Sequence, residues 1–261
     1  MTGKFILLGS GNSSGVPAIG NDWGKCDPDE PRNRRTRPGA VVEKDGFRLL
    51  LDMGPDLSYQ LTREEIRTVD AVLLTHAHAD HVNGIDDIRT IRFRIGYPLP
   101  LYGLGKHIDE LGSHFPYAFG KATSTFYKAY LEPKPINEKK IGLPCTIGPV
   151  EFTPFMQDHG TCRSLGFRFG SLGYSTDMLT LDEKAIEILK GVDTWIADGA
   201  SYNRPNPVHA TLEEVYRLNG MINAKKVYIT HLPRNMDYGK LIGELPEGYE
   251  PAYDGLTLPV D

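Results

Sequence analysis

Short apolar runs separated by turn-forming residues characterise the first half of the chain. Four of these runs have the length of β-strands, and they cover residues 5–8, 39–44, 47–54 and 69–76. Asp45-Gly46 separates the second run from the third, which predicts a β-hairpin. Residues 56–67, between the third run and the fourth, predict a helix.

Strand-like and helix-like patterns also share the rest of the chain. The predicted strands cover residues 99–102, 150–155, 165–169, 194–198 and 226–230. The predicted helices cover residues 82–93, 182–190 and 211–222, and the last begins with a capping box formed by Thr211 and Glu214. Residues 115–143 are rich in Tyr, Phe, Lys and Pro without a clear period. We interpret them as a functional flap whose aromatic residues, within 115–130, could close over a substrate.

Length and composition favour one α/β domain over residues 1–261. The net charge of −5 argues against binding of large nucleic acids by a basic face, but it leaves room for a local phosphate site. Three cysteines without paired spacing, Cys26, Cys145 and Cys162, suggest a reducing compartment. The first apolar run is too short for a signal peptide, and no apolar run is long enough to span a membrane. We therefore expect a cytoplasmic protein without a membrane partner.

A histidine-rich hexapeptide, HAHADH, follows the fourth apolar run. It places His76, His78, Asp80 and His81 within six positions. These side chains cannot all be buried in a core without partners, because each needs hydrogen bonds or a counter-charge there. A surface loop could carry them without binding anything. The alternative is two pairs of ligands diverging from one turn, and imidazole with carboxylate suits zinc, manganese or iron.

Three more residues of ligand type occur where apolar strands end. They are His159, Asp177 and His231. Strand ends meet at one edge of a sheet, which is where open α/β sheets usually form their sites. His107 and His114 instead fall in a helical pattern, and we expect them to be solvated or packing side chains.

The HxHxDH pattern and the three later residues resemble the metallo-β-lactamase superfamily. The resemblance extends from Phe5 to Gly255, and it implies a four-layer αββα sandwich of two similar halves. It also implies a dinuclear site: one metal bound by His76, His78 and His159, the other by Asp80, His81 and His231, with Asp177 bridging them. Asp52, in the segment LLLDMG, would orient ligands of the cluster, although it could also be a plain turn aspartate.

Two features are similar to the phosphodiesterase branch of that superfamily. GSGNSSGVPAIG at residues 9–20 resembles the glycine-rich opening shared by tRNA 3′-processing ribonucleases and the cyclic-phosphate phosphodiesterase of the carbon–phosphorus lyase pathway. His209 matches the histidine of this branch that faces the scissile phosphate, and Asp198 could orient it. The chain lacks the Gly/Pro-rich arm with which the tRNA ribonucleases grip tRNA, so the cyclic-phosphate phosphodiesterase is the better match. Only Cys26 stands where that enzyme has a zinc-binding cysteine cluster, so a structural zinc is not expected.

The resemblance predicts a metal-dependent phosphodiesterase. Two divalent ions, zinc or manganese, would hold a bridging hydroxide that attacks small cyclic or nucleotide-type diesters. Asp80 would hold or accept the proton of this nucleophile, and His209 would bind the phosphate and assist the leaving group. The alternatives are a thioesterase or lactonase with the same metals, and a non-catalytic nucleotide-binding protein. A homodimer is possible.

Overall fold

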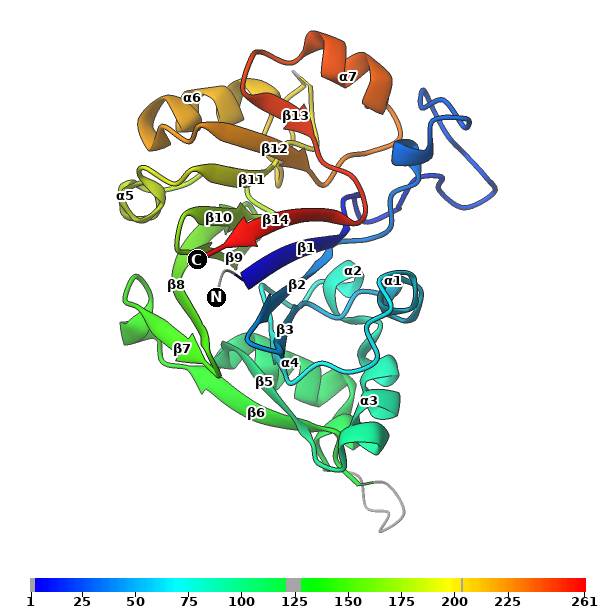
Figure 1. Ribbon diagram of the computed structural model, residues 1–261, viewed down its shortest axis with the longest axis vertical. Coiled ribbons are helices and arrows are strands. Elements are labelled where there is room, and N and C mark those ends of the chain that lie inside the picture. Colours follow the sequence, from blue (N-terminus) through cyan, green and yellow to red (C-terminus); the bar gives the residue numbers. More distant parts are fainter. Residues whose placement is uncertain (1–2, 121–127, 203) are drawn as a thin grey trace.

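Two seven-stranded sheets lie face to face in the middle of the molecule (Figure 1). The computed structural model describes residues 3–120, 128–202 and 204–261. The first sheet has the order β14-β1-β2-β3-β4-β5-β6, and the second has the order β13-β12-β11-β10-β9-β8-β7. Each half of the chain therefore contributes one sheet, except that the C-terminal strand returns to pair with β1.

The first sheet is covered by helices from the first half of the chain. Its strands are β1 (Gly3–Gly9), β2 (Gly39–Lys44), β3 (Phe47–Leu51), β4 (Ala71–Leu73), β5 (Leu99–Leu104), β6 (Leu131–Ile136) and β14 (Leu256–Val260). The helices are α1 (Leu57–Arg63), α2 (Ala79–Val82), α3 (Ile88–Ile95) and α4 (Gly105–His114). Short 3₁₀ turns occur at Pro31–Asn33, Ile85–Asp87, Pro116–Phe119 and Glu138–Lys140.

The second sheet is built in the same way. Its strands are β7 (Cys145–Ile147), β8 (Val150–His159), β9 (Cys162–Phe169), β10 (Leu172–Ser175), β11 (Thr194–Asp198), β12 (Lys226–Thr230) and β13 (Tyr249–Pro251). Its helices are α5 (Glu183–Leu189), α6 (Leu212–Ile222) and α7 (Tyr238–Glu244). In both sheets the strands that end beside the candidate metal centre run parallel to one another. In the first sheet β3 is parallel to β4, and in the second sheet β10, β11 and β12 are parallel.

Three hydrophobic cores separate the four layers. One lies between the sheets, one between the first sheet and its helices, and one between the second sheet and its helices. In β3, Leu49 and Leu51 join the central core and Leu50 joins the outer one, because alternate side chains point to opposite faces. This is why the strand is a continuous apolar run, and the four-layer αββα prediction is confirmed.

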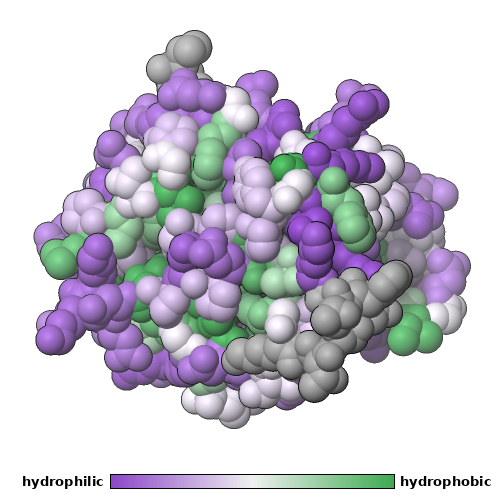
Figure 2. All heavy atoms as spheres, turned by 90° about the horizontal axis from the view of Figure 1, so that it is seen from below, coloured by the Kyte–Doolittle hydropathy of each residue, from purple (hydrophilic) through white to green (hydrophobic). Residues whose placement is uncertain are grey.

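The outer surface agrees with this layering. In the face seen in Figure 2, apolar residues lie mostly in recesses between protruding hydrophilic side chains. Among the described residues, no helix has both the length and the apolar character needed to cross a membrane.

Several predicted elements differ from the observed ones. The single helix predicted over 82–93 is divided into α2, a 3₁₀ turn and α3. The division occurs at Gly84, which packs so tightly on the preceding loop that an added Cβ would lie 2.0 Å from Gly54 O. The capping box is formed in part: Thr211 caps α6, while the Glu214 carboxylate binds Thr180 and Arg217 instead.

The flap interpretation of 115–143 is wrong for much of the segment. Leu131–Ile136 forms the edge strand β6, whose two prolines fit an edge position and disguised the strand in the sequence. Phe115, Tyr117 and Tyr130 pack against the outer core of the first sheet. Residues 121–127 lie outside the described residues. The sequence patterns indicated a strand before Asp177 without giving its bounds, and it is β10; they missed the strands β7, β13 and β14 and the helix α7.

Candidate metal centre

Histidine and aspartate side chains from both halves of the chain converge where the parallel strands end. The seven predicted ligands all belong to this cluster: His76, His78, Asp80, His81, His159, Asp177 and His231. The first four follow β4 and enter α2, while the other three come at the end of β8, after β10 and after β12. The fold therefore brings together residues that are up to 155 positions apart (76 to 231).

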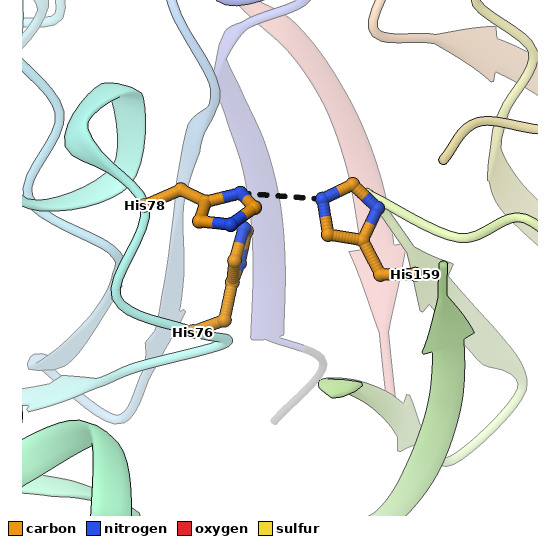
Figure 3. Close-up of side chains that lie close together, drawn as sticks. All are labelled: His76, His78 and His159. Atoms are coloured by element: carbon orange, nitrogen blue, oxygen red, sulfur yellow. Dashed lines mark hydrogen bonds between the residues drawn. The ribbon is translucent and has the colours of Figure 1, made fainter. Parts of the chain in front are cut away.

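Three histidines form the first group of the cluster. Figure 3 shows His76 and His78 on the loop after β4, facing His159 from β8. His78 Nδ1 lies 3.3 Å from His159 Nε2, and the rings of His76 and His78 are 4.4 Å apart. The other nitrogen of His78, Nε2, lies 3.7 Å from Cys162 Sγ. His78 therefore directs Nδ1 toward the cluster and Nε2 away from it.

Asp177 lies between this group of three histidines and a second group, which consists of Asp80, His81 and His231. Its Oδ1 is 3.6 Å from His159 Nε2 and 3.9 Å from His76 Nε2. Its Oδ2 is 3.0 Å from His81 Nε2 and 3.3 Å from His231 Nδ1. One carboxylate thus presents one oxygen to each group.

Several nitrogens at this centre lack the partners that buried polar atoms normally have. His76 Nε2, His81 Nε2 and His231 Nδ1 are buried at 3.9, 3.0 and 3.3 Å from the Asp177 carboxylate, and in the described part of the chain none of them forms a well-aligned hydrogen bond. Such atoms are rare in folded proteins and require an explanation. The imidazole nitrogens and carboxylate oxygens fall into groups of three whose ligand atoms lie within 4.8 Å of one another, a donor set that suits a divalent transition metal. The residues present therefore fit the metal that the resemblance implies.

The electrostatics of the cluster separate its members. Burial opposes ionisation of Asp177, but His231 and His81 keep the pKa of its carboxyl well below the usual value. Burial and the neighbouring His81 lower the pKa of His76 well below its usual value. Burial would also lower the pKa of His81, yet Asp177 and Asp52 raise it well above the usual value. The neighbouring carboxylates therefore favour a positive charge at His81, whereas burial disfavours one at His76.

Asp52 supports the cluster from behind. It is fully buried at the end of β3, where its Oδ2 accepts a hydrogen bond from His81 Nδ1 at 2.7 Å. Thr75 donates to the same carboxylate through its backbone N–H and its hydroxyl, each at 2.8 Å. This arrangement fixes His81 with Nε2 toward Asp177. The sequence patterns missed Thr75, whose only signal is its position directly before His76.

The backbone is strained at three of these positions. Asp52, Asp177 and His231 have φ values of 63°, 51° and 61°, in the left-handed region that non-glycine residues rarely adopt. Each residue comes directly or almost directly after a parallel strand. The left-handed turn directs the chain sharply across the end of the sheet, and such strain is typical of functional sites.

His209 lies beside the cluster with a partner of its own. Its Nδ1 is 2.6 Å from Asp198 Oδ2, and its ring stacks on His231 at 4.5 Å. Burial opposes protonation of His209, but Asp198 raises its pKa to about 9. Asp198 is itself held by the backbone N–H groups of Met178 and Ala200. One nitrogen of His209 is therefore fixed by a buried carboxylate, and the ring edge faces the cluster.

The remaining histidines lie outside the centre. His107 is buried in α4, where Nε2 lies 3.0 Å from the Arg163 carbonyl oxygen, and it has a packing role as expected. His114 is exposed at the end of the same helix. All three cysteines are free thiols, and Cys26 lies against the buried Arg35 guanidinium.

Comparison with known families agrees with this fold and cluster. The model of the beta-lactamase superfamily domain matches residues 47–232, and the chain belongs to the metallo-β-lactamase superfamily. A PhnP-family diphosphatase and ribonuclease Z are among its relatives, which supports the phosphodiesterase branch of that superfamily. A crystal structure of a diphosphatase from the PhnP family is 33% identical, with a TM-score of 0.88 over 99% of this chain and 97% of that chain.

Two curated relatives differ in how much they share. An octanoyltransferase of Porphyromonas gingivalis (strain ATCC BAA-308 / W83) is 31% identical over 266 residues, covering 99% of this chain and 52% of that protein. The chain thus spans about half the length of this relative. Ribonuclease Z of Methanopyrus kandleri is 40% identical over 76 residues, which cover 28% of this chain and 27% of that protein. The chain is therefore a hydrolase-superfamily protein with a cluster of side chains that could bind metal.

Proposed function

We propose that this chain is a phosphodiesterase that hydrolyses small cyclic or nucleotide-type diesters with two divalent transition-metal ions, zinc or manganese. The observation that carries the proposal is the position of Asp177. Its two oxygens face two groups of ligand atoms, and three nitrogens in these groups have no other partner in the described chain. His76, His78 and His159 would hold one ion, Asp80, His81 and His231 the other, and Asp177 would bridge them.

The protein side chains would then share the catalytic work. Bound divalent cations lower the pKa of a water molecule and offset negative charge on phosphate oxygens. Asp80 is partly exposed, and in this proposal it would hold or accept the proton of the attacking water. Asp52 would bind Nδ1 of His81 and so keep its Nε2 directed toward the metal ion.

His209 would act on the leaving group. Asp198 accepts the hydrogen bond from Nδ1, so a second proton on the ring would reside at Nε2. From there it could hydrogen-bond the phosphate and protonate the departing alkoxide. The partly exposed position of His209 is compatible with contact to a substrate.

A second candidate function is thioester hydrolysis. The relative from Porphyromonas gingivalis has an acyl-transfer name, and acyl groups are often carried as thioesters. A metal-dependent thioesterase or lactonase would use the same metal cluster but would not require the His209–Asp198 pair. The close contact in that pair, 2.6 Å, favours the phosphodiesterase.

The two candidates are separated by one comparison of substrates. The chain is stripped with chelator, reloaded with zinc or manganese, and assayed on bis(p-nitrophenyl) phosphate and on an acyl-coenzyme A thioester. We expect turnover of the phosphodiester that depends on added metal, with elemental analysis approaching two ions per chain. Metal-dependent turnover of the thioester alone would replace the proposal with the second candidate. A chain that binds metal and hydrolyses neither substrate would favour a non-catalytic nucleotide-binding protein.

A further inference from the structure

The turn that carries Asp177 begins where β10 separates from β9. The two strands are paired from Leu172 with Phe169 to Tyr174 with Phe167, and the pairing ends there. Three residues later the chain enters the left-handed turn at Asp177. The carbonyl groups of this turn still need hydrogen-bond donors, because Thr176 and Asp177 are buried.

Two buried side chains, one from β8 and one from β9, supply these hydrogen bonds. Ser164 Oγ donates to the Asp177 carbonyl oxygen, and Gln157 Nε2 donates to the Thr176 carbonyl oxygen, each at 2.8 Å. Gln157 Nε2 also donates to Ser164 Oγ at 2.9 Å, which leaves the hydroxyl proton for Asp177. Within the turn, Thr176 Oγ1 donates to Asp177 Oδ2 at 2.8 Å. The held backbone therefore also holds the carboxylate.

The Gln157 side chain is not there for packing alone. Its Oε1 is buried and has no hydrogen-bond partner among the described residues, which costs stability. Gly166 makes room for it, because an added Cβ at that position would lie 2.5 Å from Gln157 Oε1. An apolar side chain could fill the same space without an unpaired oxygen. A buried polar group of this kind calls for an explanation, and its bond to the Asp177 turn provides one.

The same piece of β9 contacts the other half of the metal centre. Leu165, next to Ser164, donates its backbone N–H to the Thr75 carbonyl oxygen at 3.0 Å. Thr75 directly precedes His76. Two adjacent residues of β9 thus hold the Asp177 turn through a side chain and the start of the histidine loop through the backbone.

We propose that Gln157 and Ser164 are positioning residues that fix the Asp177 turn and so keep its two oxygens divided between the two groups of ligand atoms. This inference rests on the two-metal phosphodiesterase function proposed above. Without these hydrogen bonds the turn could relax from its left-handed conformation, and its carboxylate would no longer reach both groups. Loss of either residue should therefore weaken both metal positions together.

Ser164→Ala tests the inference through metal binding. Competition with a chelator dye measures the zinc affinity of the wild type and the variant, and we expect both zinc affinities of the variant to fall about 10- to 100-fold. The visible spectrum of the cobalt-loaded variant should also change, because it reports the coordination of the ions. Ser175→Ala is the matched control: Ser175 is fully buried, but its hydroxyl accepts a hydrogen bond from Trp195 Nε1 and does not hold the turn. The control should lose thermal stability yet keep the wild-type affinity and spectrum.

Gln157→Met is a second variant, which keeps the length of the side chain and removes the amide. It tests the inference even if Ser164→Ala fails to fold. Wild-type zinc affinity and cobalt spectrum in either folded variant would overturn the inference and leave the proposed function intact. An equal loss of affinity in Ser175→Ala would also overturn it, because general loosening of the core would then suffice. A wild-type chain that binds no divalent metal would overturn both the inference and the proposed function.

Discussion

His81 and Asp52 form a fully buried pair, in which His81 Nδ1 lies 2.7 Å from Asp52 Oδ2. The pair fixes the imidazole so that its other nitrogen faces Asp177, 3.0 Å away. An asparagine cannot hold the negative charge that supports the ring in this position. We expect Asp52→Asn to weaken metal binding about 10- to 100-fold, the usual effect of losing such a supporting group.

Competition with a chelator dye measures this affinity. Asp70→Asn is the matched control, because the Asp70 carboxylate also accepts a backbone hydrogen bond, from Arg48, but lies outside the cluster. Unchanged affinity in Asp52→Asn would show that Asp52 is a plain turn residue.

Asp177→Ala should reduce the occupancy of both metal positions together. The reason is that each of its oxygens faces a different group of histidines. Asp80→Ala provides the contrast, because Asp80 approaches only the His81 side and should affect one ion. Elemental analysis after gel filtration gives ions per chain. Two ions per chain in Asp177→Ala would contradict the bridging role.

His209→Ala should lower kcat on diesters with alkoxide leaving groups by about 10²–10⁴, the usual range for loss of a general acid. The loss should be much smaller for p-nitrophenolate, which departs without protonation. Metal content should stay the same, and His114→Ala, an exposed histidine on α4, should change neither quantity. If His209→Ala loses an ion, then His209 is a ligand, which its position near His159 and Asp177 would permit.

Asp237 should make stability depend on pH. Burial opposes its ionisation, but hydrogen bonds from Asp27 N, Lys240 N and the Asn33 side chain lower its pKa below the usual 3.8. A carboxyl whose pKa is depressed by folding stabilises the protein above its unfolded-state pKa and stops doing so as pH falls through the folded-state value. Asp237→Asn should therefore cost about 1–3 kcal/mol at pH 7, the penalty for poorly satisfied buried groups.

Urea unfolding at a series of pH values measures the effect. The difference between the wild type and Asp237→Asn should persist down to about pH 4 and shrink below it. Asp29→Asn, an exposed aspartate on the loop that Asp237 anchors, should show no difference at any pH. A difference independent of pH would show that the side-chain charge is irrelevant.

Local patterns in the sequence determined most of the sheet strands and the ligand types. HAHADH after an apolar strand indicated a metal site because imidazole and carboxylate groups are costly to bury alone. His159, Asp177 and His231 could be chosen because each follows an apolar run, and the carboxyl ends of parallel strands meet at one edge. These inferences need only residue type, periodicity and order along the chain.

Only the tertiary structure decided which groups face one another. The two oxygens of Asp177 are divided between two histidine groups because β4, β8, β10 and β12 end together, and no local pattern encodes that meeting. The same holds for Thr75 and Leu165, which are 90 positions apart (75 to 165) yet share one backbone hydrogen bond. The edge strand β6 and the returning strand β14 were hidden for a related reason. Their strand character comes from hydrogen bonds to distant partners, which outweigh their weak local preference.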